Sequence, residues 1–200
     1  MNSKRSENYP LHRRAVVKEL LAQRGDVLVV AGLGAAAWDV TAAGDRPLNF
    51  PLWGSMGGAV PLGLGLALAQ PSRRVLVITG DGEMLMGLAS LATVAIQKPA
   101  NLVIVVLDNE RYGETGMQLT HTAGAVDLGA IAAASGIPST HTVTDKKGLK
   151  SAIPQIQKKM GPLFVNIKVR AEELPLVLPP KDGAYLKDRF RSALIGEAKD

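Results

Sequence analysis

The chain has 200 residues, of which 46% are apolar but only 4% aromatic, so we expect one α/β domain with a core of small aliphatic side chains. There is no cysteine, which excludes disulfides, thiolate metal sites, iron–sulfur clusters and a cysteine nucleophile. The net charge of +5 comes from scattered Lys and Arg that do not alternate with aromatics, so we expect no nucleic-acid binding.

Strand and helix patterns alternate along the chain. Apolar residues at helical spacing predict a first helix from Pro10 to Arg24, ended by Gly25. The elements expected after it are strand 27–31, helix 55–70, strand 75–79, helix 83–97, strand 102–107, a loop over 109–125, helix 127–135 with Asp127 as N-cap, strand 140–143, helix 146–159 and strand 163–169.

This β-α-β alternation predicts a doubly wound, mostly parallel sheet with helices on both faces. We expect residues 1–170 to form the domain. Residues 171–200 form a tail, rich in proline at first and helix-like at its end, that packs on the domain or on a partner.

Polar residues follow two of the predicted strands, where ligands bind in such sheets. The first strand runs directly into Gly80-Asp81-Gly82 and then a helix, whose free N–H groups favour an anion. An aspartate there would repel a bare phosphate, unless a hard divalent cation such as Mg²⁺ lies between them. The second strand delivers Asp108 and Asn109 to the same edge. Each motif alone is more often a turn, but the pair predicts a magnesium and diphosphate site.

Gly80-Asp81-Gly82 followed by Asn109 resembles the signature of thiamine-diphosphate-dependent enzymes, in their pyrophosphate-binding domain. Asp108 stands where that family has the first of two asparagines. The resemblance implies that Asp81 and Asn109 supply side-chain oxygens to Mg²⁺ and Arg111 its backbone carbonyl. It also implies that Gly82 and Glu83 offer N–H groups to the diphosphate, with Gly80, Tyr112 and Gly113 beside the cofactor.

Two further segments extend the resemblance. The segment Leu52-Trp-Gly-Ser-Met-Gly lies where the family holds its cofactor in a bent conformation. The resemblance implies that Met56 props the thiamine and that the Gly54 carbonyl accepts a hydrogen bond from the 4′-amino group. It also implies that Ser55 lines the site. Without the Gly-Asp-Gly motif, Met56 would be taken for a core residue. Gly34 and Ala35 resemble a turn that touches the diphosphate through its backbone. Gly32-x-Gly34 is also a truncated dinucleotide fingerprint, but no acidic residue closes a following strand.

The resemblance covers the pyrophosphate domain only, about 27–169, and 200 residues leave no room for a second α/β domain. It therefore implies a pyrimidine-domain partner subunit, in a hetero-oligomer such as a dimer of heterodimers. The short subunit of two-chain sulfopyruvate-type decarboxylases has a similar length and a similar Asp-Asn…Tyr-Gly-x-Thr-Gly loop, and phosphonopyruvate decarboxylases end in a similar domain.

The function expected from this resemblance is decarboxylation of a small anionic 2-oxo acid. Glu114 is the candidate proton donor, or else a solvated loop carboxylate, and Gln118, Thr120 and His121 could face substrate. A carboligase subunit and a cofactor-binding or regulatory module without chemistry of its own remain alternatives. No apolar run has the length of a membrane span and the N-terminus is not signal-like, so a cytoplasmic location is expected.

Overall fold

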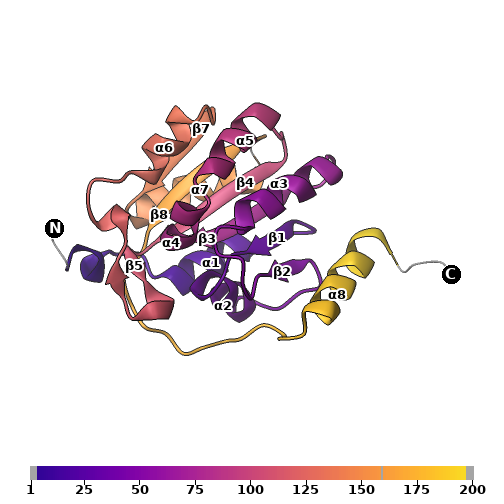
Figure 1. The fold of residues 1–200 in the computed structure, drawn as a ribbon, viewed down its shortest axis with the longest axis horizontal. Coiled ribbons are helices and arrows are strands. Elements are labelled where there is room, and N and C mark those ends of the chain that lie inside the picture. The colour runs from indigo at the N-terminus through magenta and orange to yellow at the C-terminus, as the bar shows by residue number, and fades with distance from the viewer. Residues whose placement is uncertain (1–3, 159, 197–200) are drawn as a thin grey trace.

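The computed structural model describes residues 4–158 and 160–196. At its centre is a six-stranded parallel sheet in the order β2-β1-β3-β4-β8-β7 (Figure 1). The strands are β1 (Leu28–Ala31), β2 (Asn49–Pro51), β3 (Val75–Gly80), β4 (Leu102–Asp108), β7 (Ser139–Val143) and β8 (Leu163–Lys168). The predicted fold class is confirmed.

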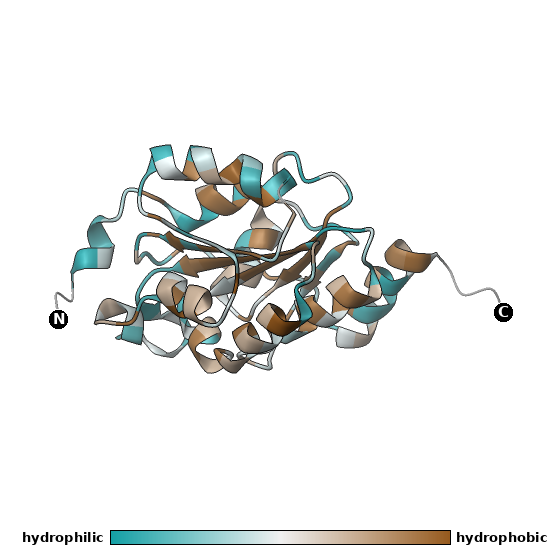
Figure 2. Ribbon diagram, turned by 90° about the horizontal axis from the view of Figure 1, so that it is seen from above, coloured by the Kyte–Doolittle hydropathy of each residue, from teal (hydrophilic) through white to brown (hydrophobic). Residues whose placement is uncertain are grey.

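Helices cover both faces of the sheet, and Figure 2 shows its apolar strands between them. One face is packed by α1 (Arg13–Leu21), α2 (Ala35–Ala42) and α7 (Lys146–Lys158), and the other by α3 (Ala59–Ala69), α4 (Asp81–Met86), α5 (Ala89–Gln97), α6 (Leu128–Ala134) and α8 (Gly183–Ile195). Alternate residues of one strand serve alternate faces, as the pleat requires: in β4, Val103 and Val105 pack on the first face, Ile104 and Val106 on the second.

The strand order reverses between β1 and β3. The chain passes from β1 outward to β2, then returns across β1 to add β3 on the other side. Connections leaving neighbouring strands in opposite directions open a crevice at their carboxyl ends, where ligands bind in sheets of this kind. The segments that enter this crevice are Gly32–Ala35 after β1 and Gly80–Gly82 around the end of β3.

The prediction of one continuous helix over 83–97 is wrong. Two helices stand there, α4 and α5, separated at Gly87 and Leu88, and α4 begins already at Asp81. The break accompanies a close backbone approach: a β-carbon on Gly87 would lie 2.6 Å from the carbonyl oxygen of Gly57. The helix expected from residue 55 begins only at Ala59, because Ser55 and Gly57 have φ angles of 58° and 94° in the turn before it.

Other differences lie in the loops. The predicted loop 109–125 holds a hairpin of β5 (Arg111–Tyr112) and β6 (Gln118–Leu119), with short 3₁₀ turns at Gly113–Thr115 and His121–Ala123. Helix α2 and strand β2 were not predicted. The Asp127 cap is confirmed, since its side chain accepts from the N–H groups of Gly129 and Ala130. Lys159, the last residue of the expected helix 146–159, lies outside the described residues.

The C-terminal tail crosses the molecule and ends in α8, which packs against the outermost strand β2 (Figure 1). Trp53 Nε1 donates to the Pro180 carbonyl at 2.7 Å. The rings of Phe50 and Phe190 meet edge to face, with centroids 5.4 Å apart. Arg189 pairs with both carboxylate oxygens of Asp45. No helix among the described residues has the length and apolarity to cross a membrane.

Candidate active site

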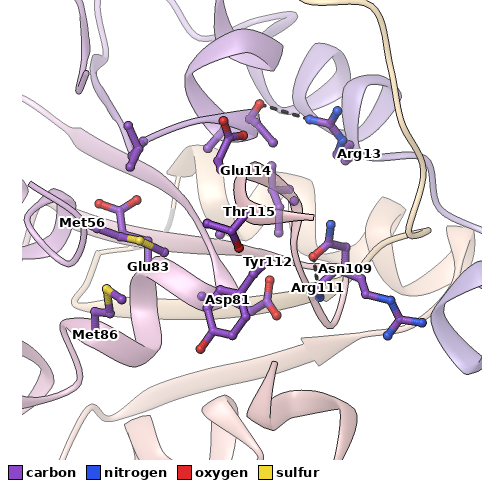
Figure 3. Close-up of a pocket in the computed structure, with 17 residues that line it drawn as sticks. Arg13, Met56, Asp81, Glu83, Met86, Asn109, Arg111, Tyr112, Glu114 and Thr115 are labelled. Atoms are coloured by element: carbon purple, nitrogen blue, oxygen red, sulfur yellow. Dashed lines mark hydrogen bonds between the residues drawn. The ribbon is translucent and has the colours of Figure 1, made fainter. Parts of the chain in front are cut away.

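A pocket of about 340 Å³ opens at the crevice between the carboxyl ends of β1 and β3 (Figure 3). The residues of the predicted site that line it are Ala35, Met56, Gly80, Asp81, Gly82, Glu83, Asn109, Arg111, Tyr112, Gly113 and Glu114. Gly54 and Ser55 are not in its lining, and Gly34 adjoins it through Glu114. Segments as far apart in the chain as those of Ala35 and Glu114 thus meet where the topology predicts a ligand.

Asp81 is the most buried acidic group of the pocket. The residue is 2% exposed, at the first position of α4. Burial, and then the neighbouring Asp108 carboxylate, raise the pKa of Asp81 to about 7. No ion pair to a basic side chain is found for Asp81 among the described residues, so its ionised form lacks a compensating positive charge there.

The Asn109 segment follows β4 and turns back toward Asp81. The Asn109 side-chain oxygen accepts the Arg111 N–H at 3.0 Å, which fixes a tight turn. Glu110 between them has a positive φ of 62°. The Tyr112 ring then lies against Gly82, where a β-carbon would come within 2.6 Å of it. Tyr112 therefore packs over the Gly-Asp-Gly segment, and only glycine leaves it room.

These residues fit a magnesium ion that is bound together with a diphosphate. Among the described residues, no group of three or more His, Asp or Glu side chains could enclose a metal without other ligands. Mg²⁺ typically takes one or two carboxylates and completes its octahedron with amide or carbonyl oxygens, water and substrate phosphates. Asp81, whose carboxylate has no ion-pair partner among the described residues, and Asn109 line the same pocket, and this combination matches that chemistry.

Glu83 was predicted to contribute only its backbone N–H, but its side chain also makes hydrogen bonds. Its side chain is buried, accepting the Thr79 hydroxyl at 2.7 Å and the Ala59 N–H at 3.2 Å. Burial raises the pKa of this carboxyl, and the backbones of Gly57 and Leu33 act to lower it without offsetting the burial. One carboxylate thereby joins the loop after β1 to the turn that carries Met56.

Met56 stands at the open side of the pocket, beside Met86 (Figure 3). Met56 is 38% exposed, and its Cε would lie 3.5 Å from a β-carbon on Gly82. The side chain therefore projects over the Gly-Asp-Gly segment.

Glu114 lies at the other end of the pocket, at the N-terminus of α2. A β-carbon on Gly34 would be 2.5 Å from Glu114 Oε1. Burial raises the pKa of the Glu114 carboxyl. The charge of Arg13 and the backbone of Ala35 act in the opposite direction, but burial is the larger effect. Arg13 in turn donates to the Ala35 carbonyl at 3.2 Å and to buried Asp39 at 2.7 Å.

Sequence reasoning missed the pocket residues Arg13 and Met86 and the role of the Glu83 side chain. Arg13 carried no local signal, because its position in an amphipathic helix is that of any core-flanking residue. Of the loop residues expected near substrate, Thr120 is buried and bonds to Asp81, Gln118 bonds to Thr115, and His121 is exposed.

The parallel sheet, the crevice at its reversal point and the paired Asp81 and Asn109 segments define a pyrophosphate-binding domain of the thiamine-diphosphate type. Residues 33–167 match the family model described as thiamine pyrophosphate enzyme, C-terminal TPP binding domain. The chain belongs to this family, and the resemblance seen in its sequence is confirmed.

The similar proteins include decarboxylases of two architectures. The chain is 35% identical over 190 residues to sulfopyruvate decarboxylase subunit beta of Methanothermobacter thermautotrophicus, covering 95% of this chain and 99% of that one. It is 40% identical over 182 residues to phosphonopyruvate decarboxylase of Streptomyces viridochromogenes, covering 90% of this chain but 45% of that enzyme. The fold matches benzoylformate decarboxylase of Polynucleobacter necessarius with a TM-score of 0.69, at 23% identity, over 84% of this chain and 34% of that one.

Proposed function

We propose that this chain is the Mg²⁺- and thiamine-diphosphate-binding subunit of a 2-oxoacid decarboxylase. The observation that carries the proposal is the match along 99% of a decarboxylase β subunit. It is supported by the pocket around the buried Asp81 carboxylate, for which no cationic partner is found in the part of the chain that the structure describes. The cofactor, when bound, serves as the electron sink for loss of carbon dioxide from the substrate. The chain's own residues bind it, orient it and exclude water.

Roles follow from where the residues lie. Asp81 and Asn109 would give side-chain oxygens to Mg²⁺, with the Arg111 carbonyl beside them. The backbone N–H groups of Ala35 and Glu83, with Gly34 and Gly82, would receive the diphosphate at two helix N-termini. Met56 would prop the thiamine against the carbonyl of Gly54. The other predicted lining residues, which would close the sides of the pocket, are Ser55, Gly80, Tyr112 and Gly113.

The partner in this proposal is a pyrimidine-domain subunit. The similar protein of Methanothermobacter thermautotrophicus is named a β subunit, which implies a second chain in that enzyme. We propose the same division here, in a dimer of heterodimers, with a small anionic 2-oxo acid such as sulfopyruvate or phosphonopyruvate as substrate. The net charge of +5 favours an anionic substrate.

The test is to assemble the chain with the pyrimidine-domain subunit of the same genome and titrate thiamine diphosphate by calorimetry, with and without Mg²⁺. Asp81→Ala should abolish Mg²⁺-dependent binding and leave the fold intact, because Asp81 lies at a strand end and not among the apolar core. Undiminished affinity in Asp81→Ala would refute the site.

Activity of the same complex separates the remaining alternatives. Release of carbon dioxide and an aldehyde from a 2-oxo acid supports a decarboxylase. A larger ketone product, formed only when an acceptor aldehyde is added, would identify a carboligase. Cofactor binding without turnover of any 2-oxo acid in a panel would indicate a binding or regulatory module.

A further inference from the structure

A buried hydrogen-bond network lies behind Asp81. Asp81 Oδ2 contacts the hydroxyl of Thr120 at 2.5 Å and that of Thr122 at 3.2 Å. The two hydroxyl oxygens are 2.9 Å apart, and both threonines are at most 2% exposed. Neither hydroxyl contacts Oδ1 of Asp81. In residues 4–158 and 160–196, side-chain donors are thus found for one carboxylate oxygen and none for the other, which is left for a different partner.

The segment that carries the threonines is the returning side of the β5–β6 hairpin. The Thr120 N–H donates to the Glu110 carbonyl at 3.0 Å, directly after the pairing of Leu119 with Arg111. The turn over Thr122 closes where the Ala123 N–H donates to the Thr120 carbonyl at 3.1 Å. The backbone that presents Arg111 therefore also presents the hydroxyls that hold Asp81.

Asp108 fixes the network from behind. Its Oδ1 contacts the Thr122 hydroxyl at 2.8 Å, and its Oδ2 accepts from Lys168 Nζ at 2.7 Å and Asn166 Nδ2 at 3.0 Å. Each hydroxyl has one proton, so Thr120 can donate to Asp81 while Thr122 shares its proton between Asp108, the closer acceptor, and Asp81. A carboxylate accepts from all of these donors. An asparagine at 108 has only one accepting oxygen. Its donating N–H₂ group would therefore face either the donors Lys168 and Asn166 or the hydroxyl of Thr122.

We propose that Thr120 and Thr122 are positioning residues: they hold Oδ2 of Asp81 so that Oδ1 faces the magnesium ion, and Asp108 with Lys168 holds Thr122. The inference rests on the proposed function, since it assigns the orientation of the carboxylate that would bind the metal. It also explains why an aspartate stands at 108 in place of the first asparagine of the family's pair: a carboxylate can accept from Thr122, Lys168 and Asn166 together.

Loss of these hydroxyls should affect the affinity for Mg²⁺ and the affinity for Ca²⁺ differently, because the two cations need different coordination geometries. Mg²⁺ demands near-ideal octahedral geometry, whereas Ca²⁺ accepts six to eight oxygens in flexible arrangements. Partners that orient metal ligands typically contribute roughly 10- to 100-fold in metal affinity. A loosened Asp81 should therefore weaken Mg²⁺ binding by about tenfold or more, and Ca²⁺ binding by clearly less.

The experiment measures cation affinity in the assembled complex. Mg²⁺ or Ca²⁺ is titrated by calorimetry at saturating thiamine diphosphate into the wild type, Thr120→Val, Thr122→Val and the serine variants of both positions. Valine keeps the shape of threonine without its hydroxyl, and serine keeps the hydroxyl. Thr142→Val, at an exposed position of β7, is the matched control. Thermal unfolding without cation or cofactor reports on the fold.

The proposal expects a selective loss of Mg²⁺ affinity in the valine variants, near wild-type values in the serine variants and the control, and little change in unfolding temperature. Equal losses for both cations together with a lower unfolding temperature would show general structural support and overturn it. Unchanged Mg²⁺ affinity in both valine variants would overturn it as well.

Asp108→Asn gives a second measurement that leaves both threonines in place. The nearly isosteric change should reproduce the selective Mg²⁺ loss through Thr122, and wild-type selectivity in this variant counts against the network. A wild-type complex that binds neither cation contradicts the proposed function itself, which distinguishes that failure from failure of the positioning role.

Discussion

The carboxylate of Glu114 lies against Gly34, so close that a β-carbon at Gly34 would meet Glu114 Oε1 at 2.5 Å. Gly34 precedes α2, and the backbone of Ala35 at the start of that helix acts to lower the pKa of the same carboxyl. A carboxylate on a helix N-terminus occupies the place that favours a phosphate. Glu114 therefore occupies the end of α2 that would receive the diphosphate in the proposed site, and it competes with the diphosphate for that place.

Glu114→Gln should bind thiamine diphosphate more tightly than the wild type, by roughly three- to tenfold, since the displaced group then carries no charge. Calorimetry on the assembled complex with Mg²⁺ measures this, and Glu19→Gln on the exposed side of α1 is the control. Weaker binding in Glu114→Gln would contradict the competition. Unchanged binding with a lower kcat would instead support Glu114 as the proton donor.

The same contact predicts a pH dependence. Burial raises the pKa of Glu114, so its carboxyl takes up a proton at a higher pH than a solvated glutamate does. Above that pKa the wild type carries the competing charge and binds more weakly than Glu114→Gln. Below it the two should converge. A constant difference across the range would show that the carboxylate charge is not responsible.

Glu83 should be a stability determinant of both cofactor loops. Glu83→Ala removes the acceptor of the Thr79 hydroxyl and of the Ala59 N–H, which are buried. We expect the free energy of unfolding to fall by about 3 kcal/mol or more, because each unsatisfied buried donor costs about 1–3 kcal/mol. Glu83→Gln keeps one acceptor oxygen and should lose less. Denaturant unfolding measures both variants, and a loss no larger than that of exposed Glu19→Ala would refute this role.

The pair Asp108 and Lys168 should show a measurable coupling energy. A double-mutant cycle of Asp108→Asn and Lys168→Met is expected to give about 1–3 kcal/mol, since Asp108 is fully buried and the Lys168 side chain is 14% exposed. Glu110, 3.1 Å from the same ammonium, limits the value. The control is the exposed pair Lys187 and Asp188, which should give close to zero. Equal coupling in the two cycles would contradict a buried ion pair.

Gly87 should tolerate no side chain. Gly87→Ala places a β-carbon 2.6 Å from the Gly57 carbonyl, which must shift the turn that carries Met56. We expect a loss of about 1–3 kcal/mol in unfolding free energy, together with weaker cofactor binding. Gly65→Ala, inside α3 with nothing within 4 Å, should stabilise by about 0.5–1 kcal/mol. A neutral Gly87→Ala variant would show that the two turns can separate.

Local pattern predicted those parts of the molecule that depend on neighbours in the chain. The β-branched runs of β3 and β4 and the polar residues directly after them identify both strand ends and the chemistry expected there. The Ala-rich α2 was missed because Gly32 and Gly34 favour a turn, and β2 because three residues carry too little periodicity. Thr120, Thr122 and the Glu83 carboxylate contact partners on other elements, and no sequence spacing reports such contacts.

The two edges of the sheet are protected by different means. Strand β7 presents Ser139, Thr140, His141 and Thr142, a polar edge that does not favour pairing with another apolar strand. Strand β2 has α8 packed against it, with Arg189 held by Asp45 and Phe190 on Phe50. The C-terminal helix thus shields an apolar edge from self-association, and a chain shortened before Asp182 should aggregate through β2.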